Sequence, residues 1–253
     1  MTSETVHDLV AKQFGPRAAA YVESSVHAHG EDLDELAALA RTHEFASALD
    51  LGCGGGHVGF TLAPHIGEIV AYDLSQEMLA AVVAEAIKRG FSNLATRQGT
   101  VEALPFADAS FDFVATRYSA HHWLDVPRAL GEARRVLKPG GRAMIMDVIA
   151  PEAPLLDTFL QTVEMLRDPS HVRDYSLREW TAMLRAAGFT PSEPVRRRVH
   201  LDYASWIARM GTPKLQADAI LALMAQMPAE VGAHFAVAPD GSFTIDTMSV
   251  VAG

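Results

Sequence analysis

The sequence predicts an α/β protein with a doubly wound, Rossmann-like sheet of seven mostly parallel strands. Three observations predict this fold. Strand-like and helix-like segments alternate along the chain, which is typical of a parallel sheet covered by helices. The first strand-like run leads directly into a glycine-rich loop at residues 52–56. The chain has 253 residues, 49% of them hydrophobic, which is enough for one α/β domain with a large core.

Two helices are expected before the first strand, at 5–14 and 16–41, with breaks at Gly15-Pro16 and near Gly30. The strand-like runs that follow are 46–51, 68–74, 93–98, 111–116, 142–148, 195–201 and 243–250. We expect the last two of these runs to form an antiparallel pair at the edge of the sheet.

Capping signals delimit the helices between these strands. Ser75 is a typical N-cap for a helix that ends at Gly90. Ser176 and Glu179 have the spacing of a capping box, and that helix ends at Gly188. The other expected helices are 125–137, 153–167, 203–210 and 213–226, and residues 168–175 form an irregular polar stretch.

Composition excludes several classes of protein. The lone Cys53 rules out a disulfide scaffold and argues against a cysteine-based zinc site. The longest stretch without Asp, Glu, Lys or Arg is 51–67, which contains six glycines, so no membrane span is expected. The first twenty residues lack a signal-like apolar run, which predicts a cytoplasmic protein. The net charge of −10 makes a nucleic-acid partner unlikely, and strand alternation divides Arg196–Arg198 between two faces.

The loop after the first strand carries the most information about function. Its glycines allow the backbone to turn sharply and to approach a ligand. Gly56 is four residues after Gly52, whereas a dinucleotide fingerprint needs its third glycine or alanine five positions after the first, where this chain has His57. Asp50, two residues before the first glycine, would repel a pyrophosphate but suits a cationic group. These features argue against the alternative of a nicotinamide-dependent oxidoreductase.

A second carboxylate follows at the end of the next strand. Asp73 is 21 residues after Gly52, where a carboxylate can accept hydrogen bonds from both hydroxyls of an adenosine ribose. The crevice thus offers one carboxylate to an ammonium group, glycine N–H groups to a carboxylate, and a second carboxylate to a ribose. This set suits S-adenosylmethionine better than a dinucleotide.

With these residues the chain resembles the class I S-adenosylmethionine-dependent methyltransferases, and most strongly the branch of the ubiquinone/menaquinone C-methyltransferases. Five motifs carry the resemblance, occur in family order and cover roughly residues 45–150. They are Leu-Asp-Leu-Gly-Cys-Gly-Gly-Gly at 49–56, Asp-Leu-Ser-Gln-Glu-Met-Leu at 73–79, Glu-Ala-Leu-Pro-Phe at 102–106, Ser-Phe-Asp at 110–112 and Arg-Val-Leu-Lys-Pro-Gly-Gly at 135–141.

The resemblance implies a cofactor, S-adenosylmethionine, bound across the carboxyl ends of the first, second and fourth strands, with S-adenosylhomocysteine as product and no metal. Where the family has an Asp that meets the adenine amino group, this chain has Thr100, so its hydroxyl, the Val101 N–H or apolar contact would recognise adenine. The residues expected to contact the cofactor are Asp50, Gly52, Cys53, Gly54, Gly56, Asp73, Leu74, Thr100, Val101, Glu102 and Arg117.

The implied reaction is in-line methyl transfer to a small-molecule acceptor. A non-catalytic S-adenosylmethionine-binding module is the other interpretation. His121 or His122, after the fourth strand, could take a proton from the acceptor, although either could instead pack in the core or cap a helix. Tyr118, His171, Arg173 and Tyr175 are candidate substrate-binding residues, and a solvated surface loop is the alternative for the last three.

One domain is expected over residues 1–253. Within it, 1–44 form a helical cover, 45–150 the cofactor-binding core, and 151–253 the substrate cover and the sheet edge, including a helical insertion after the fifth strand. Phe14, Tyr21 and His27 of the first segment could close the pocket. The sequence leaves open the acceptor, the attacked atom and the oligomeric state.

Overall fold

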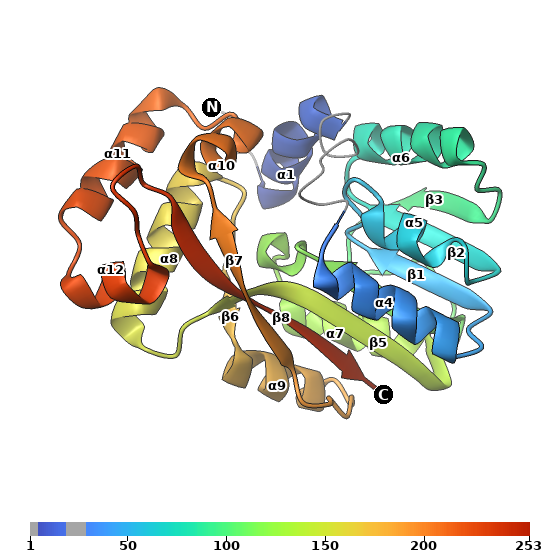
Figure 1. Ribbon diagram of the computed structural model, residues 1–253. Coiled ribbons are helices and arrows are strands. Elements are labelled where there is room, and N and C mark those ends of the chain that lie inside the picture. Colours follow the sequence, from blue (N-terminus) through green and yellow to red (C-terminus); the bar gives the residue numbers. More distant parts are fainter. Residues whose placement is uncertain (1–4, 19–28) are drawn as a thin grey trace.

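The strands form one sheet in the order β3-β2-β1-β4-β5-β8-β7, as the computed structural model shows for the described residues, 5–18 and 29–253 (Figure 1). A further short strand, β6, pairs with β5. The strands are β1 Ser47–Leu51, β2 Glu68–Asp73, β3 Leu94–Gln98, β4 Phe111–Arg117, β5 Leu137–Ala150, β6 Tyr175–Ser176, β7 Val195–Leu201 and β8 Phe243–Ala252.

The strand directions confirm the predicted doubly wound sheet. The pairs β1–β2, β1–β4, β2–β3 and β4–β5 are parallel, whereas β8 is antiparallel to both β5 and β7. The expected antiparallel pair therefore forms one edge of the sheet. β5 begins earlier than predicted because the chain through the turn at Lys138–Gly141 already belongs to the strand.

Helices cover both faces of the parallel half, because alternate side chains of each strand are apolar and point to opposite faces. On one face, Ala48 and Phe113 pack with α4 Glu31–Thr42 and α5 His57–Leu62. On the other face, Leu49 and Val114 pack with α7 Val126–Val136 and α9 Leu177–Ala186. α6 Gln76–Arg89 packs beside α5 through Leu79, Val82 and Ala86.

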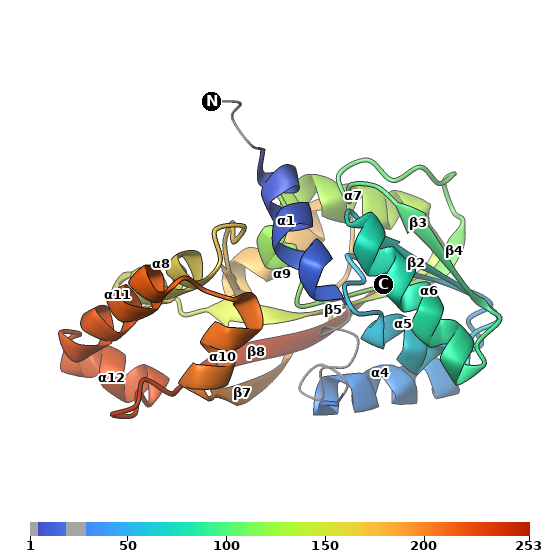
Figure 2. The same cartoon turned by 90° about the horizontal axis from the view of Figure 1, so that it is seen from above.

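A third group of helices lies at the other end of the molecule, beside the antiparallel strands (Figures 1 and 2). It consists of α8 Pro154–Arg167, α10 Tyr203–Met210, α11 Lys214–Ala225 and α12 Ala229–Phe235. Trp206 and Phe235 are buried there together with Phe243 of β8. The short α12 was not predicted from the sequence. No helix of the described residues is both long and apolar enough to cross a membrane.

The N-terminal helices follow the expectation within the described residues. α1 Val6–Phe14 is confirmed, and a 3₁₀ helix, η1 Gly15–Arg17, follows it. The break expected near Gly30 is confirmed, because α4 begins at Glu31 with Gly30 as its N-cap. Tyr21 and His27 lie outside the described residues. The caps predicted at Ser75 and Ser176 are both present.

Candidate functional site

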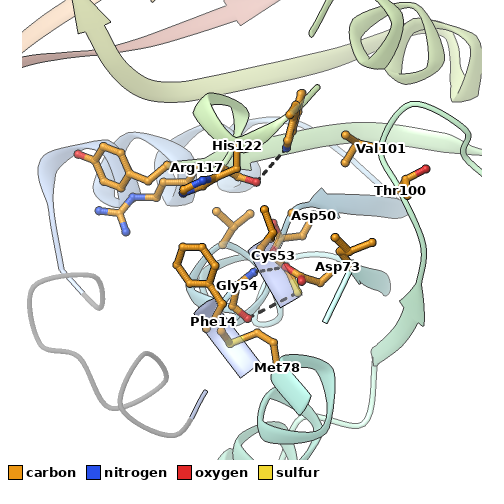
Figure 3. Close-up of a pocket in the computed structure, with 18 of the residues that line it drawn as sticks. Phe14, Asp50, Cys53, Gly54, Asp73, Met78, Thr100, Val101, Arg117 and His122 are labelled. Carbon is orange, nitrogen blue, oxygen red and sulfur yellow. Dashed lines mark hydrogen bonds between the residues drawn. The ribbon is translucent and has the colours of Figure 1, made fainter. Parts of the chain in front are cut away.

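A cleft opens at the carboxyl ends of β1, β2 and β4, where the parallel strands of such sheets commonly bind ligands. The close-up in Figure 3 shows Asp50, Cys53, Gly54 and Asp73 at its centre, between Phe14 and Met78 on one side and Thr100 and Val101 on the other. Ten of the eleven residues expected to contact the cofactor line this cleft: Asp50, Gly52, Cys53, Gly54, Asp73, Leu74, Thr100, Val101, Glu102 and Arg117.

The exception is Gly56, which the structure does not place among the lining residues. Its φ is 77°, and an added Cβ would lie 3.0 Å from Val82, within the α6 packing. The local packing of the loop therefore accounts for Gly56, and its contact with the cofactor stays a prediction. At Gly52, an added Cβ would lie 1.9 Å from Oγ of Ser119, whereas no described atom lies within 4 Å of the same position at Gly54.

Two carboxylates, the buried Asp50 and the partly buried Asp73, shape the electrostatics of the cleft. Asp73 accepts hydrogen bonds from the backbone N–H groups of Gly54 and Ser75, each at 2.9 Å, and burial raises the pKa of Asp73. Asp50 is 1% exposed and accepts a hydrogen bond from Gly59 N–H at 3.0 Å. Burial raises the pKa of Asp50 to about 7, so a cationic ligand group nearby would favour its ionised form.

The N-terminal helix supplies part of the cleft, through Phe14, which was expected there, and through His7 and Val10, which were not. His7, Val10 and Phe14 of α1 line it, and α1 lies across this end of the sheet (Figures 1 and 2). His7 Nε2 lies 3.8 Å from Oε2 of Glu102, an oxygen with no hydrogen-bond partner in the described part of the chain. Other lining residues that were missed are Gly55, His57, Val58, Met78, Gly99, Ser119 and Trp123.

A second cavity, of about 590 Å³, adjoins the cleft. The two share Phe14, Arg117, Tyr118 and His122. Arg117 at this boundary forms a buried ion pair with Asp32 of α4. The rest of the second cavity is lined mainly by residues from β5, β7, β8, α8, α10 and the segment 168–174.

His121 lies at the wall of the second cavity, with its Nδ1 2.7 Å from Oδ1 of Asp147. Burial alone would lower the pKa of His121, but the charge and hydrogen bond of Asp147 outweigh it and raise this pKa to about 9.

The ring of His122 lies 4.3 Å from that of His121, between centroids. Its Nδ1 is 3.1 Å from the carbonyl oxygen of Ser170. Burial, and then the charge of His121, lower the pKa of His122 to about 4.

The segment 168–174 brings more titratable groups to this cavity. His171 lines it, with Nε2 3.0 Å from Oε1 of Gln161, and burial lowers the pKa of His171 well below its ordinary value. Asp174 also lines it, and burial raises the pKa of Asp174 to about 8. One ligand atom from each of His121, Asp147 and Asp174 lies within 4.8 Å of the others, a spacing compatible with a metal ion.

Two of the expected substrate residues are placed elsewhere. Arg173 and Tyr175 line neither cavity. Arg173 instead forms ion pairs with Asp157 at 3.1 Å and Glu179 at 3.5 Å, which account for its charge. The ring of Tyr175 packs against Trp180 at 6.1 Å between centroids. Both residues hold the segment against α8 and α9, and this structural role accounts for their positions without a substrate.

Comparison with known proteins gives consistent matches over most of the chain. Residues 49–145 match the family described as "Methyltransferase domain". The uncharacterized protein YafE of Escherichia coli is 46% identical over 79% of this chain and 96% of its own length. The uncharacterized methyltransferase YcgJ of Bacillus subtilis is 40% identical over 84% of this chain and 81% of its own.

The crystal structure of YcgJ superposes with a TM-score of 0.85 over 88% of this chain and 98% of YcgJ, at 35% identity. A demethylmenaquinone methyltransferase of Bacillus velezensis is 34% identical over about half of each chain, 51% of this one and 56% of its own. The similarity to that protein is therefore limited to part of the molecule.

Proposed function

Since the chain belongs to the class I S-adenosylmethionine-dependent methyltransferases, in the ubiquinone/menaquinone branch, we propose that the cleft binds S-adenosylmethionine and that the adjoining cavity binds a small-molecule acceptor. The main support for this arrangement is that the cleft and the cavity share a wall. This wall is formed by Phe14, Arg117, Tyr118 and His122. Through this boundary a methyl group in the cleft would face an acceptor in the cavity.

The residues of the cleft fit the cofactor. Asp50 is a buried carboxylate that an ammonium group would help to ionise. Gly54 exposes its backbone to open space, as close approach of a ligand requires. Asp73 is fixed at the end of β2, where it can accept hydrogen bonds from the ribose hydroxyls. Thr100 and Val101 form the wall on the side assigned to adenine.

The bound cofactor supplies an activated methyl group, and the chain has to align the acceptor with it and exclude water. The packing of Phe14 against His122, with ring centroids 5.0 Å apart, helps to close the boundary between cleft and cavity. Arg117 is held by Asp32 and so contributes a fixed wall.

His122 is the group that we assign to accept a proton from the acceptor. A carbonyl oxygen only accepts hydrogen bonds, so the contact with Ser170 O places the proton of a neutral His122 ring on Nδ1. The lone pair then lies on Nε2. His122 also borders both spaces, whereas His121 borders only the acceptor cavity.

The acceptor cavity is built mostly by residues outside the matched family region 49–145, which contributes only four of its lining residues: Arg117, Tyr118, His121 and His122. For this reason the quinone substrates in the names of more distant relatives are not transferred to this chain. Tyr118 and His171 remain the proposed contacts to the acceptor from the sequence-based set.

The test is a panel of hydroxylated, aminated and carbon-acid acceptors, with release of S-adenosylhomocysteine as the readout. For an acceptor that is methylated, we expect His122→Asn to lower kcat by about a hundredfold or more while the affinity for S-adenosylhomocysteine is kept. The exposed His65 provides the matched control, since His65→Asn should leave both quantities unchanged. Equal turnover by His122→Asn and the natural chain would refute the assignment of His122.

A further inference from the structure

Three histidines and three buried aspartates meet at the inner end of the acceptor cavity. His121 pairs with Asp147, His122 lies 3.9 Å from Asp168, and His171 lies 3.9 Å from Asp174. Each of these side chains is at most 17% exposed. In the described part of the chain, none of the three carboxylates has an ion pair with lysine or arginine. The cluster therefore gathers three buried carboxyl groups and three imidazoles without a lysine or arginine ion pair to any of the carboxyl groups.

Within this cluster, His121, Asp147 and Asp174 have the geometry of a metal site. One ligand atom from each lies within 4.8 Å of the others. His121 Nδ1 and Asp147 Oδ1 are 2.7 Å apart, close to the separation of about 3 Å between neighbouring ligands of an octahedral ion with bonds of about 2.1 Å.

Other contacts fix the orientation of two of these groups, as the surroundings of metal ligands commonly do. The backbone N–H of Ala120 donates to Oδ2 of Asp147, and that of Val148 donates to Oδ1. The backbone of Asp174 is held on both sides by the side-chain amide of Gln161, which accepts from its N–H and donates to its carbonyl oxygen.

The side chain of Asp174 provides an independent indication of a missing ligand. It is 1% exposed, and its Oδ2 has no hydrogen-bond partner among residues 5–18 and 29–253. The nearby Nε2 of His171 does not supply one, because it lies 3.9 Å away and contacts Oε1 of Gln161 at 3.0 Å. A buried carboxylate oxygen without a partner is costly, and a cation bound there would remove that cost.

We propose that His121, Asp147 and Asp174 bind one divalent metal cation at the inner end of the acceptor cavity. One imidazole and two carboxylates suit borderline and hard ions such as Mn²⁺, Fe²⁺ and Zn²⁺. His121 and Asp174 line the cavity, so the remaining coordination positions face it.

A cation at this position would favour particular classes of acceptor. An acceptor that carries a hydroxyl, enol or carboxylate oxygen could complete the coordination of the cation. This consequence rests on the function proposed above, whereas binding of the cation itself does not. This proposal departs from the expectation, drawn from the sequence, that the protein uses no metal.

The test uses the full chain after dialysis against a chelator. The metal-free protein is titrated with Mn²⁺ alone, and binding is measured by calorimetry and by the loss of the electron paramagnetic resonance signal of free Mn²⁺. We expect one bound Mn²⁺ per chain. Asp174→Asn and His121→Asn should each weaken binding by about tenfold or more. Glu31→Gln removes one charge from another wall of the same cavity and should bind Mn²⁺ like the natural chain.

Two companion measurements keep the outcome unambiguous. Thermal denaturation shows whether each variant is folded, and Asp174→Glu, which restores a carboxylate, should recover part of the lost affinity. S-adenosylhomocysteine binding, measured on the metal-free protein, tests the proposed cofactor cleft separately. Absence of Mn²⁺ and Zn²⁺ binding at millimolar concentration, or equal binding by folded Asp174→Asn, would overturn the metal site and show that His121 and Asp147 share only a proton.

Discussion

The backbone N–H of Gly54 donates a hydrogen bond to Oδ2 of Asp73 at 2.9 Å, which joins the glycine loop to the end of β2. One carboxylate thus both braces the loop and faces the cleft. Asp73→Ala should weaken S-adenosylhomocysteine binding by about ten- to a hundredfold, since the loss of a charged hydrogen-bond partner costs about 1.5–3 kcal/mol.

Calorimetric titration measures this effect, and Asp112→Ala is its control. Asp112 also accepts hydrogen bonds from backbone N–H groups, those of Ala46 and Ser47, but it does not line the cleft. Its replacement should lower stability and leave the affinity unchanged. If the two variants weaken binding equally, the effect at Asp73 is one of stability alone.

Binding should depend on pH through Asp50. Because burial raises the pKa of Asp50 to about 7, its carboxyl is largely protonated at pH 6 and largely ionised at pH 8. Affinity for S-adenosylhomocysteine, whose ammonium group would lie against this carboxylate, should therefore rise from pH 6 to pH 8. Titrations in Asp50→Asn should be flat over the same range, and an equal pH dependence in this variant would exclude Asp50 as the cause.

The same pKa shift predicts an opposite effect on the stability of the ligand-free protein. Between about pH 4 and 7 the folded chain retains a proton on Asp50 that the unfolded chain has released, so the contribution of Asp50 to folding becomes less favourable as the pH rises and is constant above about 8. Asp50→Asn should accordingly raise Tm at pH 8 and change it little near pH 4. A lower Tm at pH 8 would contradict this.

Two glycines with positive φ allow the effect of backbone strain to be distinguished from that of ligand contact. Gly54 and Gly90 have φ of 46° and 76°, and no described atom lies within 4 Å of an added Cβ at either. Alanine at each position should cost about 1–2 kcal/mol of stability, because both are in the left-handed region. Only Gly54→Ala should also reduce S-adenosylhomocysteine binding, since its Cβ would enter the cleft; equal affinity in the two variants would count against the placement of the loop beneath the ligand.

Phe14 belongs to the wall of both cavities and packs edge-on against His122. Phe14→Ala should increase the dissociation rate of S-adenosylhomocysteine by about fivefold, roughly 1 kcal/mol of lost aromatic contact. Stopped-flow displacement measures this rate. Leu9 lies on the same helix but lines neither the cleft nor the acceptor cavity. The variant Leu9→Ala therefore reports the effect of weakening α1 in general. The rate should be slower in Leu9→Ala than in Phe14→Ala.

The cofactor cleft could be predicted from the sequence because its determinants are local. Asp50 and Gly54 are consecutive parts of one strand and loop, and Asp73 ends the next strand, which lies beside it in the parallel sheet. Their positions follow from strand direction alone. For α1, Phe14 was expected at the pocket, but the contacts of His7 and Val10 could not be predicted, since nothing in residues 6–14 indicates which surface the helix packs on.

The acceptor side was predicted less well because its residues interact over long separations in the chain. Arg173 was a candidate substrate-binding residue, but its charge is taken up by Asp157 on the neighbouring helix. Conversely, Asp147 was not singled out within its apolar strand, although it contacts His121. Such pairings depend on tertiary packing, which hydrophobic periodicity does not specify.

The cleft and the acceptor cavity are lined by different stretches of the chain, and this affects how the specificity for the acceptor can change. The cleft is lined only by residues up to Trp123, whereas most of the acceptor cavity is built from residues 148–247. If the proposed function holds, substitutions in the later stretch can therefore change which acceptor is methylated without altering the methyl donor. A chimera that carries the C-terminal region of a relative should inherit the acceptor preference of that relative and retain the cofactor affinity of this chain.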